Sequence, residues 1–138
     1  MGRNRGKTPK AVTGTVAAVP TPHDFDQDTP KFCLRHLQND YDVNNLTQSG
    51  RAAFAVALQR RSALTWTQLL MAPKHGLGKE FMPKEQIRAP IPPAFADADR
   101  FMVFRYDGTL PMAGVRAGNV FHILWIEKQY GDLYDHGS

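Results

Sequence analysis

The sequence predicts an α+β fold in which two N-terminal helices pack on one face of an antiparallel β-sheet. Residues 49–62 and 65–71 combine helix-start signals with apolar side chains at helical spacing. Residues 100–128 contain segments rich in aromatic and β-branched side chains, separated by glycine-containing turns. The length of 138 residues and a hydrophobic content of 42% suit one domain.

Residues 1–30 are expected to form a flexible, basic, proline-containing arm. They hold four prolines and three glycines but few large apolar side chains. A segment of this composition cannot bury enough apolar surface to offset its ordering entropy. The single α+β domain is therefore expected to span residues 31–138, beginning with a short strand over residues 32–37.

Two helices should follow the first strand. Ser49 is a suitable N-cap, because its hydroxyl can accept an unpaired backbone N–H, and the helix should end near Ser62. Thr65 and Gln68 have the spacing of a capping box for a shorter helix that stops before Pro73. After it, residues 74–80 form a glycine-containing basic loop, residues 81–87 are unassigned, and residues 89–93 form an extended connector with three prolines.

Three antiparallel strands are predicted over residues 100–106, 112–116 and 120–128. The pair Asp107-Gly108 is a strong hairpin signal, and residues 117–119 turn again. The near-continuous apolar run of the third strand indicates burial on both faces and an interior position. If an even-numbered turn surrounds Asp107-Gly108, Arg105 and Arg116 project from the same face. The length of the second turn leaves open whether His122 shares that face or lies opposite.

Two arginines on one sheet face could clamp a phosphodiester, because each guanidinium offers a planar fork of donors. The alternative is that Arg105 and Arg116 pair with nearby acids or lie on an exposed face. Tyr134 and His136 follow the sheet and carry exchangeable protons suited to acid–base chemistry. The alternative for these two residues is a frayed chain end.

The charge distribution also points to an anionic partner. The net charge is +4, with four basic and no acidic residues in positions 1–10, and seven basic against two acidic residues in positions 51–88. A polyanion could bind if these regions meet in space, whereas a solvated helix face is the simpler alternative.

No cofactor or metal is expected. The five histidines and Cys33 lack metal-ligand spacing, and the loop with His75 and Lys79 lacks the spacing of a P-loop. A single cysteine favours a reducing compartment, and no apolar run reaches the ~20 residues that cross a bilayer. We therefore expect a cytoplasmic protein.

The order of strand, two helices, basic loop and antiparallel strands, with 120–126 leading to 133–136, resembles the RelE/ParE superfamily of toxins from bacterial toxin–antitoxin modules. The resemblance covers residues 31–138. It implies a metal-independent endoribonuclease that cleaves mRNA, often on the ribosome, through attack of a ribose 2′-OH, and that is neutralised by a cognate antitoxin. It implies catalytic roles for Arg105, Arg116, Tyr134 and His136, and RNA contacts from Lys74, His75, Lys79 and Lys84.

Two other functions are compatible with the sequence. ParE-like relatives inhibit gyrase without cleaving RNA, and a small nucleic-acid-binding module could use the basic arm instead. The third alternative is an interaction protein whose basic residues only aid solubility.

Overall fold

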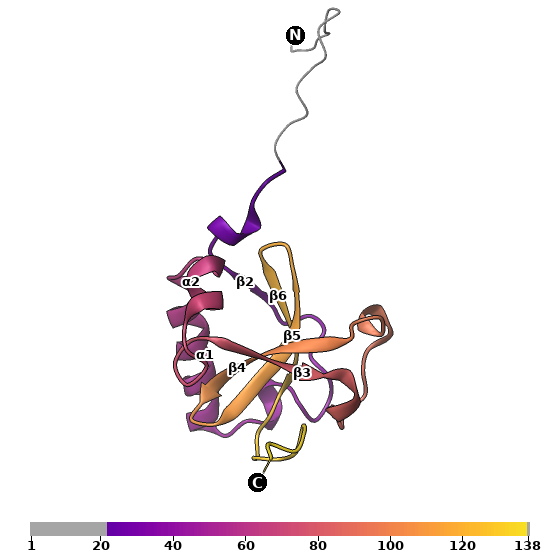
Figure 1. Ribbon diagram of the computed structural model, residues 1–138. Helices are drawn as coiled ribbons and strands as arrows, with labels where there is room; N and C mark the ends of the chain where they lie inside the picture. Colours follow the sequence, from indigo (N-terminus) through magenta and orange to yellow (C-terminus); the bar gives the residue numbers. More distant parts are fainter. Residues whose placement is uncertain (1–21, 138) are drawn as a thin grey trace, which may run out of the picture.

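The computed structural model describes residues 22–137, which form a five-stranded sheet with two α-helices (Figure 1). The strands lie in the order β2-β6-β5-β4-β3. Their bounds are Lys31–Cys33 (β2), Lys79–Pro83 (β3), Arg100–Asp107 (β4), Leu110–Ala117 (β5) and Val120–Ile126 (β6). The α+β class predicted from the sequence is confirmed, and β3 is a strand that the sequence left unassigned.

The sheet is mixed, so the prediction of an antiparallel sheet is wrong at one edge. β2 pairs in parallel with β6, whereas the other neighbouring strands are antiparallel. The amide of Lys31 donates to the carbonyl of Asn119 at 2.9 Å, at the end of the sheet where β6 begins. Because the chain enters the sheet at that end, β2 and β6 run in the same direction.

Residues 22–30, which the sequence assigns to the flexible arm, have a defined conformation. The 3₁₀ turn η1 (Phe25–Gln27) lies beside the second helix (Figure 1). The amide of Trp66 donates to the carbonyl of Asp28 at 2.9 Å, and Asn119 Nδ2 donates to the Asp28 carboxylate at 2.9 Å. The expected arm boundary is therefore wrong for this segment, while residues 1–21 lie outside the described residues.

Both helices, α1 (Gln48–Ser62) and α2 (Trp66–Met71), begin at threonine caps. Thr47 Oγ1 accepts the amide of Gly50 at 3.0 Å, so the cap lies two residues before the expected Ser49. At α2 the predicted capping box is confirmed. Thr65 Oγ1 accepts from the Gln68 amide at 3.2 Å, and Gln68 Oε1 accepts from the Thr65 amide at 2.9 Å.

One face of the sheet packs against both helices. Trp66 is fully buried there, and its indole N–H donates to the carbonyl of Asn119 at 3.0 Å. Full burial of a large apolar side chain stabilises a fold by roughly 1.5–3 kcal/mol. The cluster on this face comprises residues from α1, α2 and the strands: Phe54, Ala57, Trp66, Leu69, Met102, Phe104, Tyr106, Met112, Phe121 and Ile123 among others.

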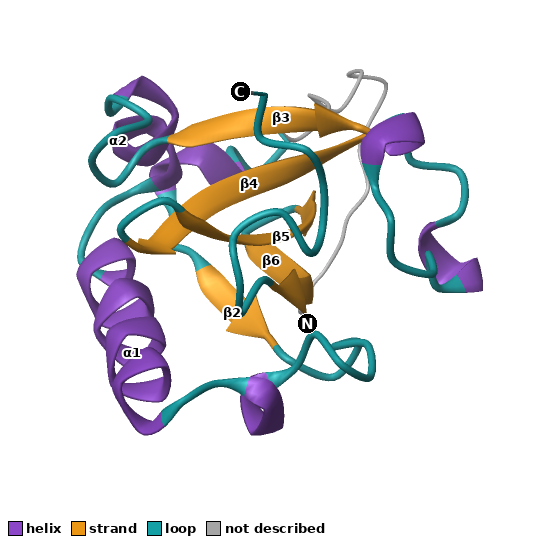
Figure 2. Cartoon of the chain, turned by 90° about the horizontal axis from the view of Figure 1, so that it is seen from below, coloured by secondary structure: helices purple, strands orange, loops and turns teal. Residues whose placement is uncertain are grey.

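The proline-rich connector and the C-terminal segment cover the opposite face (Figure 2). Trp125 Nε1 donates to the carbonyl of Pro90 at 3.2 Å. The amide of Arg88 donates to the carbonyl of Leu133 at 2.8 Å, and Leu133 is fully buried. The C-terminal segment is therefore part of the core rather than a frayed end. The connector contains two short 3₁₀ turns, η3 (Lys84–Gln86) and η4 (Pro93–Phe95). A separate 3₁₀ turn, η2 (Val43–Asn45), lies before α1.

An irregularity in the β4–β5 hairpin reverses a prediction about its side chains. Arg105 pairs with Pro111, but Asp107 pairs with Leu110, so Tyr106 is an extra residue on β4. Pro111 has no N–H to offer the ladder, which accounts for irregular pairing at this point. Because of the extra residue, odd-numbered positions of β4 before it lie opposite odd-numbered positions of β5, and even-numbered opposite even-numbered. Side chains at odd positions of the two strands therefore share one face, and those at even positions share the other.

Arg105 and Arg116 therefore lie on opposite faces of the sheet, and the prediction that they share one is wrong. Arg116 pairs with Phe121 on the helix-covered face, whereas Arg105 lies on the face of the C-terminal segment. The second hairpin has a two-residue turn, Gly118-Asn119, since Ala117 pairs with Val120. His122 consequently lies opposite Arg116, the second of the two alternatives.

Candidate active site at the C-terminal hollow

A hollow of about 320 Å³ opens between β3, β4, the loop after α2 and the C-terminal segment. We call it the C-terminal hollow. Its charged and aromatic side chains come from four separate parts of the chain, and the sheet face positions them around one space. They are Lys74, Glu80, Arg105, Tyr130, Tyr134, Asp135 and His136, so two acidic residues lie beside the two cations.

His136 lies between two tyrosine rings. Its ring centroid is 3.9 Å from that of Tyr130 and 4.3 Å from that of Tyr134, with interplanar angles of 26° and 25°. Tyr134 is almost fully buried, whereas Tyr130 is 55% exposed. Both faces of the imidazole are thus covered, which holds the ring in place and leaves its nitrogen-bearing edge for polar contacts.

A buried carboxylate fixes the orientation of His136. Nε2 of His136 lies 2.8 Å from Oε1 of Glu127, whose side chain is fully buried. The other carboxylate oxygen of Glu127 accepts the amide of Leu133 at 2.8 Å. A carboxylate that accepts from one ring nitrogen selects the tautomer and leaves the other nitrogen, Nδ1, as a base. Within residues 22–137, Nδ1 of His136 has no hydrogen-bond partner.

Arg105 supplies the principal positive charge of the hollow. Its Nη1 lies 3.1 Å from Nδ1 of His75, and its Nη2 lies 3.7 Å from the carboxylate of Glu80. The Arg105 side chain remains 24% exposed, so a ligand can reach it. Lys74 adds a second cation beside it, from the loop that follows α2.

The phenol of Tyr134 stays protonated well beyond neutral pH. Burial raises the pKa of Tyr134, and the negative charges of Glu80 and Glu127 raise it further. Arg105 acts in the opposite direction but is outweighed. Tyr134 therefore serves as a hydrogen-bond donor rather than as a base.

The hollow unites part of the predicted site. Arg105, Tyr134, His136 and Lys74 line it, and His75 joins it through its contact with Arg105. Three predicted residues lie elsewhere, as the next paragraphs describe.

Arg116 is committed to a structural contact on the other face. Its guanidinium lies 4.3 Å from the centroid of the Trp66 ring and pairs with the carboxylate of Asp26. This ion pair holds η1 against the sheet. The alternative considered from the sequence, an arginine paired with a nearby acid, is the correct one for Arg116.

Lys79 and Lys84 lie outside the C-terminal hollow. Lys79 Nζ is 5.4 Å from the centroid of Phe81, on the helix-covered face of β3. Lys84 follows β3, and its Nζ donates to the carbonyl of Ala96. The structure therefore does not bring Lys79 and Lys84, two of the implied RNA contacts, together with Arg105, Tyr134 and His136.

Sequence reasoning assigned no role to four charged or aromatic residues of this site: Glu127, Tyr130, Glu80 and Asp135. Glu127 follows directly after the most apolar strand, and an acid in that position is a usable signal for a buried, paired carboxylate. Tyr130 and Glu80 carry no such signal, because their positions depend on long-range pairing.

Among residues 22–137 no group of three or more His, Cys, Asp or Glu side chains is arranged to hold a metal ion. In the same part of the chain, no helix combines the length and the apolar character needed to span a bilayer. No protein-family model, curated protein or solved structure matches this chain.

Proposed function

We propose that this chain is a metal-independent endoribonuclease that cleaves RNA by attack of a ribose 2′-OH on the adjacent phosphate. One observation carries the proposal: His136, oriented by the buried carboxylate of Glu127, shares a hollow with the cations of Arg105 and Lys74. A histidine held in one tautomer next to cationic side chains suits phosphodiester chemistry, where a proton must move and negative charge must be stabilised.

In the proposed reaction, Nδ1 of His136 removes the proton of the 2′-OH. The 2′-oxygen bonds to phosphorus while the bond from phosphorus to the 5′-oxygen breaks. Arg105 and Lys74 neutralise the charge on the phosphoryl oxygens. The departing 5′-oxygen takes a proton from solvent, and the protonated His136 returns its proton to solvent. The Tyr134 phenol keeps its proton and donates a hydrogen bond to the phosphoryl oxygens. The products are a 2′,3′-cyclic phosphate and a free 5′-hydroxyl.

The proposal includes a biological setting. The chain acts as the toxin of a bacterial toxin–antitoxin module, its substrate is free or ribosome-bound mRNA, and a cognate antitoxin protein neutralises it. Its support is the α+β architecture with acid–base residues after the last strand. Induced expression in a bacterium should arrest growth, and mapped transcript ends should show cleavage within coding sequence.

The biochemical test uses purified protein, labelled single-stranded RNA and a chelator. Wild-type protein should release fragments with a 2′,3′-cyclic phosphate. His136→Gln keeps an N–H donor for Glu127 but has no titratable nitrogen, so it should fold normally and lose about 10²-fold or more in rate. Arg35→Gln, an exposed arginine outside the hollow, is the matched surface control. Full activity in His136→Gln would contradict the proposal.

A non-cleaving role is the second candidate, as a gyrase inhibitor or a nucleic-acid-binding module. The observation in its favour is that Arg116 is occupied by Asp26 and Trp66, so that Arg105 is the one guanidinium that residues 22–137 place in the C-terminal hollow. Growth arrest with intact transcripts and blocked replication would support the gyrase role.

A further inference from the structure

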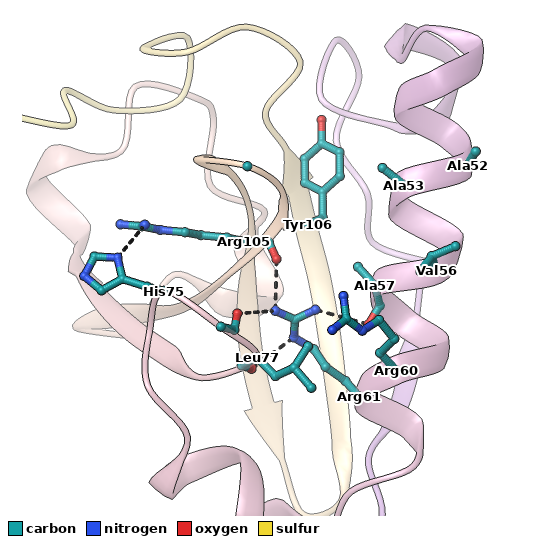
Figure 3. Close-up of a pocket in the computed structure, with 12 residues that line it drawn as sticks. Ala52, Ala53, Val56, Ala57, Arg60, Arg61, His75, Leu77, Arg105 and Tyr106 are labelled. Atoms are coloured by element: carbon teal, nitrogen blue, oxygen red, sulfur yellow. Dashed lines mark hydrogen bonds between the residues drawn. The ribbon is translucent and has the colours of Figure 1, made fainter.

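A second hollow, of about 520 Å³, lies between α1, the loop after α2 and the β4–β5 hairpin (Figure 3). We call it the α1 groove. One wall consists of small aliphatic side chains of α1, and the other walls carry basic and aromatic groups. The residues that matter here are Ala52, Val56, Arg60, His75, Arg105 and Tyr106.

A buried arginine, Arg61, holds together the three segments that form the α1 groove. The Arg61 guanidinium donates to the carbonyls of Ala57 at 3.1 Å, Leu77 at 3.2 Å and Arg105 at 2.9 Å. It thus ties the helix, the loop and β4 together, as Figure 3 shows. The loop is also closed on itself, since the amides of Gly76 and Gly78 donate to the carbonyl of Pro73 at 3.0 and 2.9 Å. The groove is therefore preformed.

Basic side chains line the α1 groove: Arg60, Arg61, His75 and Arg105. Among the described residues no acid lines it, and of these four side chains only Arg105 reaches a carboxylate, that of Glu80 at 3.7 Å. Arg61 is engaged by backbone carbonyls, but within residues 22–137 no hydrogen bond or ion pair engages Arg60. Burial, together with the nearby charge of Arg60, lowers the pKa of Arg61 to about 10. Two adjacent guanidinium groups without an acid favour an anionic ligand.

The α1 groove and the C-terminal hollow share one lining residue, Arg105, whose carbonyl accepts from Arg61 on the side of the groove. Arg105 lines both, and its guanidinium contacts His75 of the α1 groove as well as Glu80 of the C-terminal hollow. A chain molecule with regularly spaced negative charges can therefore pass from one hollow to the other across Arg105. Single-stranded RNA has this character, together with a flat apolar base at each step.

We propose that the α1 groove binds the nucleotide next to the one cleaved in the C-terminal hollow. Arg60 and His75 contact its phosphate, and its base lies against the aliphatic wall of Ala52 and Val56, where Val56 is 49% exposed. The ligand is single-stranded RNA, because a base inside a duplex cannot reach this wall. This inference rests on the proposed ribonuclease function and extends it to a second nucleotide site.

The test measures binding of fully 2′-O-methylated, hence uncleavable, RNA oligonucleotides of two, three and four residues. In wild-type protein the third nucleotide should increase the affinity about tenfold, the usual effect of a hydrogen bond to a charged group. Arg60→Gln should remove most of that gain and leave the dinucleotide affinity unchanged. It should also reduce the salt dependence of binding for the longer oligonucleotides alone, by about 0.7 in the log–log slope.

Arg35→Gln is the matched control, since it removes the same charge from an exposed position outside both hollows. Cleavage of unmodified RNA is measured in parallel, which separates this inference from the proposed function. If RNA is cleaved but the third nucleotide adds no affinity, or Arg60→Gln behaves like Arg35→Gln, the α1 groove inference is overturned and the function stands. If Arg60-dependent binding appears without any cleavage, the groove is a nucleotide site and the ribonuclease proposal falls. Absence of binding at every length overturns the groove inference.

Discussion

Oε1 of Glu127 lies 2.8 Å from Nε2 of His136, although the two residues belong to different structural layers. Glu127 follows the last strand of the sheet, and His136 comes from the segment that folds back over it. The Glu127 carboxylate also accepts the Leu133 amide, so one buried anion both closes the C-terminal segment and orients the imidazole.

This relationship predicts that Glu127→Ala destabilises the fold. The substitution leaves the Leu133 amide and one nitrogen of the His136 ring without their acceptor at the position of a fully buried carboxylate. Removal of one partner from a buried pair costs about 3 kcal/mol. Urea denaturation should show that loss in the free energy of unfolding. A change below 0.5 kcal/mol, on the order of a surface substitution, would mean that the carboxylate is dispensable.

The opposite placement of Arg105 and Arg116 predicts that the two arginines behave differently. Under the proposed function, Arg105→Gln should reduce RNA cleavage at least 10²-fold with little change in stability, because it removes the principal cation of the C-terminal hollow. Arg116→Gln should retain activity and lose about 1 kcal/mol of stability, since it loses the Trp66 ring and Asp26. Rate and urea measurements on both variants check this. Equal losses of activity would indicate that both arginines lie at one site.

The buried ring of His122 should make the fold less stable on mild acidification. Its Nδ1 is buried without a hydrogen-bond partner in the described residues, and its ring lies 5.7 Å from that of His36. Burial lowers the pKa of His122, and the proximity of His36 adds to this effect. The unfolded chain therefore binds more protons just below its ordinary pKa, near 6.5. The free energy of unfolding should be greatest above that pH and should fall as the pH drops through the folded-state pKa.

The control for this prediction is His122→Leu, which removes the titrating group. Its free energy of unfolding should change less between pH 7.5 and 5.5 than that of the wild type. An unchanged slope would assign the acid sensitivity to another group.

The protonated phenol of Tyr106 should stabilise the fold up to alkaline pH. Burial raises the pKa of Tyr106 to about 12, with Asp107 and Glu127 adding to the shift. Its hydroxyl donates to the carbonyl of Glu127 at 2.6 Å. Since the folded-state pKa exceeds the unfolded value of about 10, the stability is present below pH 10 and is lost as the pH rises toward 12. Tyr106→Phe should unfold with a weaker pH dependence in this window, measured by alkaline titration of circular dichroism.

The features predicted correctly are those set by nearby residues. The Thr65–Gln68 capping box depends on two side chains one turn apart, and it formed as predicted. The hairpin turn at Gly108 depends on a residue that tolerates φ near +59°. Tyr134, His136 and Arg105 were identified from their residue types and places in the chain, and the structure brings them into one hollow.

The features that sequence reasoning missed depend on contacts between distant segments. Tyr106 is an extra residue in the β4–β5 pairing, and one extra residue in a ladder moves every later side chain to the other face of the sheet. The parallel pairing of β2 joins residues 31–33 to residues 120–122, which no local pattern specifies. Glu127 became part of the site because the following ten residues return to it. Pro111, a proline inside a central strand, was the one local sign of the irregularity.

The guanidinium of Arg61 joins three segments that are far apart along the chain, at Ala57, Leu77 and Arg105. Contacts between distant segments form only after the loops between them have closed, which is slow. A chain in which α1 has not yet docked therefore lacks the enclosure that places His75 beside Arg105. Under the proposed function, newly synthesised molecules should acquire affinity for RNA in one step, together with this docking, and incompletely folded chains should not cleave RNA.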